Sequence, residues 1–145
     1  MTIKKVAINT IAIELFKILE DRLHEGFKLE GVEETDVEIF KLRGIFAEQR
    51  AVKDALKDEL PLFVFASYGI GMWSGTQINT PLNAGAQVII WTRDQDYLDH
   101  FQNRNPHKNL SLYHVGASKD SNDTYYKDSD HLAQEIVKRI KASQA

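Results

Sequence analysis

The sequence lacks cysteine, holds only three prolines and carries no surplus of positive charge. Without cysteine, disulfides, thiolate nucleophiles and zinc sites with sulfur ligands are excluded. Its 18 basic and 21 acidic residues give a net charge of -3, so no broad positive surface can neutralise phosphates and we expect no nucleic acid as the main partner. Polar residues interrupt the apolar run after Lys5, which predicts neither an export signal nor a membrane span. We therefore expect a cytoplasmic protein without a membrane partner.

The composition that remains is that of a globular domain. Of the 145 residues, 43% are hydrophobic and 27% are charged, which is far from the composition of disordered chains. The length suits one compact core. We predict a single domain over residues 1–145, without repeats or linkers.

Two apolar segments, Leu62 to Ser67 and Gln87 to Thr92, predict buried strands at the centre of the fold. Alternating residues predict a third strand near Asp36 to Leu42, and Leu110, Leu112 and Val115 suggest another. At the N-terminus, one alternative is that the chain begins with a short strand over Lys4 to Ile8 before it enters the first helix.

Apolar residues at steps of three and four predict helices at about Thr10 to Glu25 and Ile45 to Glu59. A short helix carries Tyr97, Leu98 and Phe101. A long polar loop is predicted from Ser118 to Asp130, and Ser129 is predicted to cap a last helix. The apolar residues of this helix that face the core are Leu132, Ile136, Val137 and Ile140.

The connection between the two central strands decides the fold class. From Thr76 to Ala86 it contains Asn79, Pro81, Asn83 and Gly85, which predict a loop. Parallel neighbours generally need a crossover helix. We therefore predict an α+β fold with a mixed or mainly antiparallel sheet flanked by about four helices; the alternative is an α/β, Rossmann-like fold.

Three glycines, Gly69, Gly71 and Gly75, follow the first central strand, where a phosphate-binding loop would lie. A dinucleotide-binding loop requires a helix at its third glycine. No helical pattern follows Gly75, so we interpret the segment as a turn or bulge. The run from Arg93 to Asp96 follows the second central strand and is typical of a helix N-terminus.

The histidines do not form a metal-binding pattern, because none lies three to five residues from another: His24, His100, His107, His114 and His131. His114 could meet Asp120 or Asp123 for acid–base chemistry, although an isolated histidine is more often structural. No Gly-x-Ser-x-Gly elbow is present. We predict no catalytic residue, no metal and no cofactor; enzymatic activity stays open, with a non-enzymatic role favoured.

The glycine-rich loop also holds Trp73, a residue type enriched at contact surfaces. We name a candidate interface from this loop and the end of the second strand; packing of Trp73 in the core is the alternative. The candidate interface consists of Tyr68, Met72, Trp73, Ser74 and Arg93.

The order of these features resembles that of phage tail-terminator proteins. The likeness lies in Leu60-Pro61-Leu62-Phe63-Val64, in the pair Trp73-Ser74, and in Val88-Ile89-Ile90-Trp91-Thr92-Arg93 before a helix. It covers about Leu60 to Phe101; the closing helix and the helix at Ile45 to Glu59 depart from the family pattern. The resemblance implies a non-enzymatic homo-oligomer that forms a ring at the tail end, joins tail to head with other tail or neck proteins, and enters the virion.

Two functional hypotheses follow. The first is this ring-forming assembly protein. The second is a Rossmann-like domain that binds or processes a nucleotide-like ligand at neighbouring strand ends: Tyr68 to Gly75, Thr92 to Asp96 and His114 to Asp120. Strand direction separates them, because the first expects the two central strands antiparallel and the second requires them parallel.

Overall fold

The computed structural model describes residues 2–10, 13–42, 56–57, 60–67, 69, 71, 73–104, 107–115 and 121–144, without the side chains of 103–104 and 121–128. Its centre is a five-stranded sheet in the order β2-β1-β3-β4-β5, and every neighbouring pair is parallel. The expected mixed or antiparallel α+β sheet is therefore wrong. The chain has the α/β, Rossmann-like architecture of the alternative, with the doubly wound order 2-1-3-4-5.

The two predicted central strands are confirmed as β3 and β4, and the alternative N-terminal strand exists as β1. The strand bounds are β1 Lys5–Asn9, β2 Glu38–Lys41, β3 Leu62–Ser67, β4 Val88–Thr92 and β5 Leu110–His114. The first helix accordingly begins later than predicted, after β1.

The described residues include four α-helices, α1 Ile13–Glu30, α3 Gly75–Asn83, α4 Gln95–Arg104 and α5 Ser121–Gln144, and a short 3-10 helix η1 at Glu34–Asp36. The predicted helix at 45–59 falls almost entirely outside the described residues. The predicted loop from Ser118 to Asp130 is helical from Ser121 onward. Ser129 therefore does not cap α5 but lies within it, and its side chain is buried.

The segment between β3 and β4 contains helix α3, which the prediction missed. Ser74 Oγ accepts a hydrogen bond from Gln77 N at 3.2 Å, and Gln77 Oε1 accepts one from Ser74 N at 2.7 Å; this capping box starts the helix. At its end Gly85 has φ +91°, a conformation that glycine adopts at little cost. The helix supplies the crossover that two parallel strands require.

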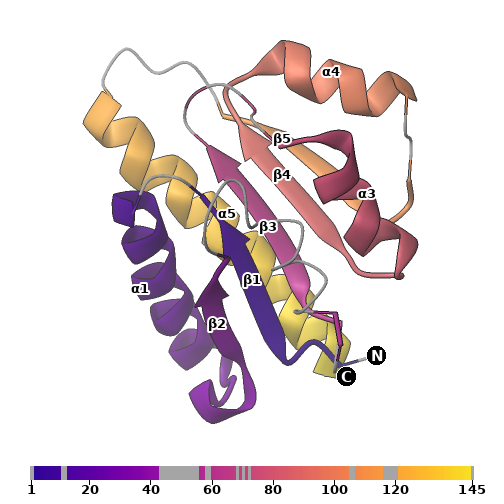
Figure 1. Ribbon diagram of the computed structural model, residues 1–145. Helices are drawn as coiled ribbons and strands as arrows, with labels where there is room; N and C mark the ends of the chain where they lie inside the picture. Colours follow the sequence, from indigo (N-terminus) through magenta and orange to yellow (C-terminus); the bar gives the residue numbers. More distant parts are fainter. Residues whose placement is uncertain are drawn as a thin grey trace.

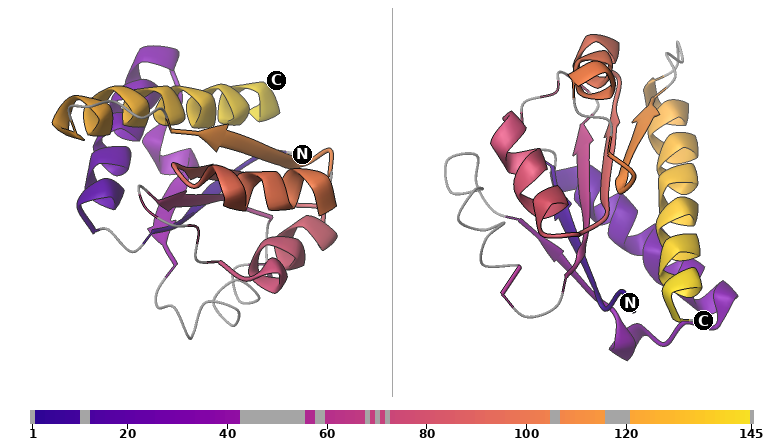
Figure 2. Two further views of the ribbon diagram at one scale, coloured as in Figure 1. Left: turned by 90° about the horizontal axis from the view of Figure 1, so that it is seen from above. Right: turned by 90° about the vertical axis from the view of Figure 1, so that its right-hand side faces the viewer.

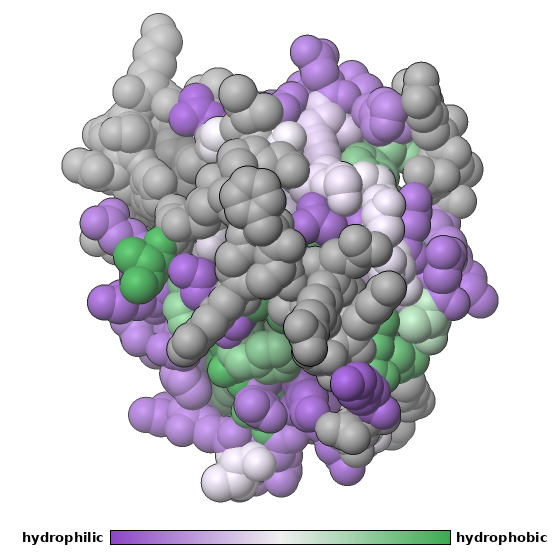
Figure 3. Space-filling view, in the orientation of Figure 1, coloured by the Kyte–Doolittle hydropathy of each residue, from purple (hydrophilic) through white to green (hydrophobic). Residues whose placement is uncertain are grey.

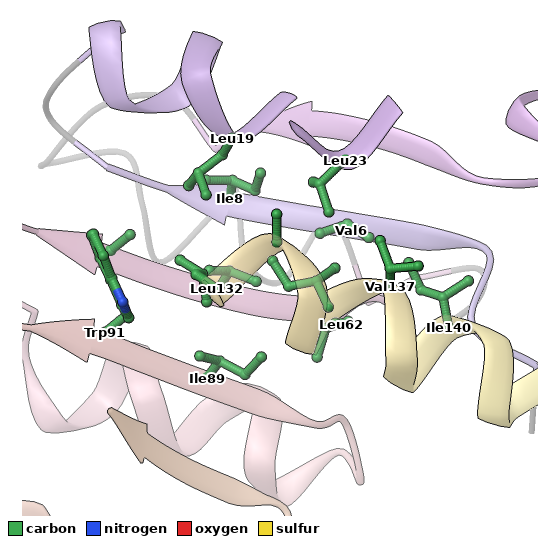
Figure 4. Packing of buried hydrophobic residues seen from close by; sticks show 14 of the residues in the cluster. Val6, Ile8, Leu19, Leu23, Leu62, Ile89, Trp91, Leu132, Val137 and Ile140 are labelled. Atoms are coloured by element: carbon green, nitrogen blue, oxygen red, sulfur yellow. The ribbon is translucent and has the colours of Figure 1, made fainter. Parts of the chain in front are cut away.

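The helices cover the sheet on both faces (Figures 1 and 2): α1 and α5 pack on one face, α3 and α4 on the other. Successive side chains of β3 point to opposite faces, so Leu62 and Val64 join α1 and α5 while Phe63 and Phe65 join α3 and α4. Figure 4 shows the first cluster, in which side chains of α1 and α5 pack against side chains of the same sheet face. This explains the continuous apolar run in β3.

Hydrophilic side chains cover much of the described surface in the orientation of Figure 3, with separate hydrophobic areas between them. Because all strands are parallel, their carboxyl ends lie at one edge of the sheet. In open α/β sheets ligands bind outside this edge. The loops that follow β3 and β4 are therefore the place to look for a site.

Candidate functional site

A hollow of about 820 Å³ lies at the carboxyl ends of β3 and β4, between the loops that lead into α3 and α4. Its lining combines three kinds of group. They are the glycines Gly69, Gly71 and Gly75, the rings of Trp73, Tyr97 and Phe101, and the ionisable side chains of Arg93, Asp94, Asp96 and His100.

The glycine-rich loop leads directly into a helix. Gly75 is the first residue of α3, so the expectation that no helix follows the third glycine was wrong. Strand β3, the glycine loop and α3 together form a strand–loop–helix unit, the context in which such loops hold phosphates. The spacing has one residue more than the common dinucleotide-binding pattern has.

Asp94 joins the two loops of the hollow. Its Oδ2 accepts a hydrogen bond from Gly71 N at 2.9 Å, and its Oδ1 accepts one from Tyr97 N at 3.1 Å. Thr92 Oγ1 adds a second link, because it donates to Gly69 O at 3.0 Å. The interpretation of this run as a helix N-terminus is confirmed, and both oxygens of the Asp94 carboxylate are used by backbone amides.

The Tyr97 ring lies directly against the backbone of Gly71. A Cβ atom at Gly71 would overlap the ring carbons of Tyr97, so only glycine fits here without a shift. The Tyr97 hydroxyl donates to Trp73 O at 2.6 Å. Burial raises the pKa of Tyr97 above its usual range, and the negative charge of Asp94 raises it further.

Trp73 is 8% exposed and belongs to the core cluster of α3 and α4. Its ring meets that of Phe65 edge-on at 5.4 Å, and its Nε1 donates to Asn9 Oδ1 at 3.0 Å. Most of the Trp73 side chain therefore packs in the core, as the alternative prediction expected. Asn9, at the carboxyl end of β1, is also buried, and its Nδ2 has no partner in the part of the chain that the structure describes.

The other residues of the candidate interface are distributed as follows. Ser74 is exposed and caps α3, and Arg93 is exposed at the rim of the hollow. Tyr68 and Met72 lie outside the described residues. The structure thus places Trp73, Ser74 and Arg93 near one another at this edge, and their role as an interface stays a prediction.

His114 is exposed at the end of β5, with its Nε2 3.2 Å from Arg93 O. The carboxylates proposed to meet it cannot be placed, because Asp120 and the side chain of Asp123 lie outside the described part of the chain. Among the described residues no cluster of three or more histidines and carboxylates could hold a metal ion.

Sequence reasoning missed Tyr97 and His100 as residues of the site, and it kept Gly75 only in the alternative hypothesis of a ligand site from Tyr68 to Gly75. Asp96, His100 and the ring of Tyr97 reach the hollow from α4, because residues three and four apart share one helical face. The signal was the position of this helix directly after a buried parallel strand. The position of this helix indicates a ligand site only when β3 and β4 are known to be parallel.

A search against protein-family models and a search of curated proteins found no match to this chain. Within the residues described, no helix combines the length and the hydrophobicity that crossing a membrane requires. Fold and site define the chain as a doubly wound α/β domain with an open hollow at the carboxyl edge of its sheet.

Proposed function

We propose that this domain binds a small nucleotide-like ligand in the hollow at the carboxyl ends of β3 and β4. The observation that carries the proposal is the strand–loop–helix unit from Leu62 to Asn83, whose glycines line the hollow. Its place at the carboxyl edge of an all-parallel sheet is where folds of this class take their ligands.

The backbone of the unit suits an anionic group. The first N–H groups of a helix have no partner within the helix, and the positive end of its dipole favours negative charge. Gly75 and Thr76, which open α3, are exposed, and its first turn holds no acidic residue. A Cβ on Gly75 would meet no atom closer than 3.9 Å, so packing does not demand glycine here, whereas close approach of a ligand would.

The side chains provide for the rest of such a ligand. Arg93 and His100 are exposed donors on the rim, suited to a phosphate. The half-buried ring of Tyr97 offers an aromatic surface for a base. A volume of about 820 Å³ lies within the range of about 300 to 1,000 Å³ that small-molecule sites occupy.

Strand direction favours this hypothesis over the ring-forming one. The Rossmann-like hypothesis requires β3 and β4 to be parallel, and they pair in parallel from Phe63 with Val88 to Ser67 with Thr92. The tail-terminator hypothesis expected the opposite direction. Ring formation and the joining of tail to head stay predictions, because strand direction bears on the fold and not on assembly.

Thermal-shift measurements with AMP, ADP, ATP, NAD and adenosine test the proposal. A ligand at 100 times its dissociation constant should stabilise the folded state by about 2.7 kcal/mol. Arg93→Ala should weaken phosphate-bearing ligands roughly tenfold, because a hydrogen bond between charged groups contributes about 1.5 to 3 kcal/mol. Lys108→Ala is the matched control, because this exposed cation precedes β5 at the opposite edge of the sheet. Unchanged melting with every probe at millimolar concentration would contradict the proposal.

A further inference from the structure

A second hollow lies on the opposite side of the molecule, between α1 and α5. These helices run side by side on one face of the sheet (Figure 1), and the groove between them measures about 850 Å³. Two ion pairs bridge the helices: Arg22 Nε to Asp130 Oδ1 at 2.7 Å, and Lys141 Nζ to Glu30 Oε2 at 2.9 Å.

Small and apolar side chains lie between these ion pairs. Gly26 approaches α5 so closely that a Cβ there would stand 2.8 Å from Val137 Cγ2. Ala133 and Ala142 line the same groove. Leu29 also lines the groove and is 87% exposed, so a large apolar side chain at this groove is left in solvent.

Charged side chains of both signs line each helix of the groove: Arg22, Glu25 and Glu30 on α1, and Asp130, Glu135, Lys138 and Lys141 on α5. Glu25 lies on the α1 side, and Lys138 lies on the α5 side; both are exposed. A two-fold axis parallel to the groove would place α1 of one copy over α5 of another. Glu25 would then face Lys138 of the second copy, and Leu29 would face the small Ala142, once in each direction, as an isologous contact requires.

We infer that the α1–α5 groove binds a second copy of this chain through reciprocal insertion of Leu29. The face has the length of α1, about 27 Å for 18 residues, and a width of roughly 20 Å for two helices. Such a face is at the small end of specific interfaces. The dimer should therefore be reversible, with a dissociation constant on the order of micromolar.

Sedimentation equilibrium of the full chain tests the inference. The apparent mass should rise with concentration from the monomer mass of 16.6 kDa toward twice that value. Leu29→Lys should weaken the dimer by at least about tenfold, because it removes a leucine that the dimer buries and puts a charged side chain in its place. Ile13→Lys is the control: it adds the same charge to α1 at a side chain that is 58% exposed and does not line the groove. A wild-type monomer at several hundred micromolar, or a Leu29→Lys dimer as tight as the control, would overturn the inference.

Charge reversal gives an independent test. Lys138→Glu should weaken the dimer, because the new carboxylate would face Glu25 of the second copy, and Glu25→Lys combined with it should restore association. Both residues are exposed, so the variants should fold. A double variant that associates no better than either single variant would exclude this arrangement.

Discussion

Replacing Gly71 by alanine should disrupt the candidate site from within. The new methyl group would overlap the ring of Tyr97, and this ring cannot turn aside freely. Its hydroxyl is hydrogen-bonded to Trp73 O at 2.6 Å, and its edge packs against Phe101 with 4.9 Å between the ring centroids. Either the ring or the glycine loop must move.

The cost follows from the interactions that this movement breaks. The hydrogen bond of the Tyr97 hydroxyl contributes about 0.5 to 1.5 kcal/mol, and that of Gly71 N to the Asp94 carboxylate about 1.5 to 3 kcal/mol. Allowing for partial relaxation, we expect Gly71→Ala to lower the free energy of unfolding by about 2 to 4 kcal/mol. Denaturation in urea, followed by circular dichroism, measures this change.

Two further variants make the result specific. Gly69→Ala is the matched control, since the nearest atom to its Cβ would be Ser67 Oγ at 4.0 Å; it should change stability by less than about 0.5 kcal/mol. In a Tyr97→Ala background the overlap disappears, so Gly71→Ala should then cost about 1 kcal/mol or less. If Gly71→Ala costs no more than Gly69→Ala, or costs the same with and without the Tyr97 ring, the reasoning is refuted.

Three other predictions follow from the core and from the pKa of Tyr97. Gly26→Ala should destabilise the protein by about 1 to 2 kcal/mol in thermal unfolding, because its Cβ would lie 2.8 Å from Val137 Cγ2; an unchanged melting temperature would contradict the close packing. Trp73→Phe should cost about 1 to 3 kcal/mol in urea denaturation, since it removes the hydrogen bond that Trp73 Nε1 donates to the buried Asn9 Oδ1. The pKa of Tyr97 is raised in the folded state. The stabilisation that comes from the protonated Tyr97 hydroxyl is therefore complete below the unfolded pKa of about 10, and it is lost as the pH rises above that value toward the folded pKa. Ultraviolet titration should therefore show late ionisation that Tyr97→Phe removes, and equal titration curves for the two proteins would contradict the raised pKa of Tyr97.

Strands β3 and β4 could be predicted because burial on both sheet faces leaves a continuous apolar run that few other structures produce. Helix α3 could not be predicted from composition, because Asn79, Pro81 and Asn83 are poor helix formers. Its signals were positional instead: Ser74 and Gln77 at capping-box spacing, and Gly85 where the helix ends. Overlooking them reversed the predicted strand direction and with it the fold class.

Only part of the site could be predicted from the sequence, and the reason was a different one. Gly69, Gly71 and Gly75 mark one loop in the sequence, but the contact of Gly71 with Tyr97 joins two loops whose proximity depends on the pairing of β3 with β4. Such contacts are set by the whole sheet, and local propensity carries no information about them. The sequence could therefore indicate the glycine loop and helix α4 separately, but not the contact between them.

The most direct test of the proposed function is an NMR titration of the isotopically labelled chain with ADP and with adenosine. If the hollow binds a nucleotide-like ligand, saturable shifts should gather at the amides of Gly69, Gly71, Gly75 and Tyr97, with larger changes for ADP than for adenosine. Saturable shifts confined to α1 and α5, or no shifts with either compound at millimolar concentration, would contradict the assignment of this hollow as the ligand site.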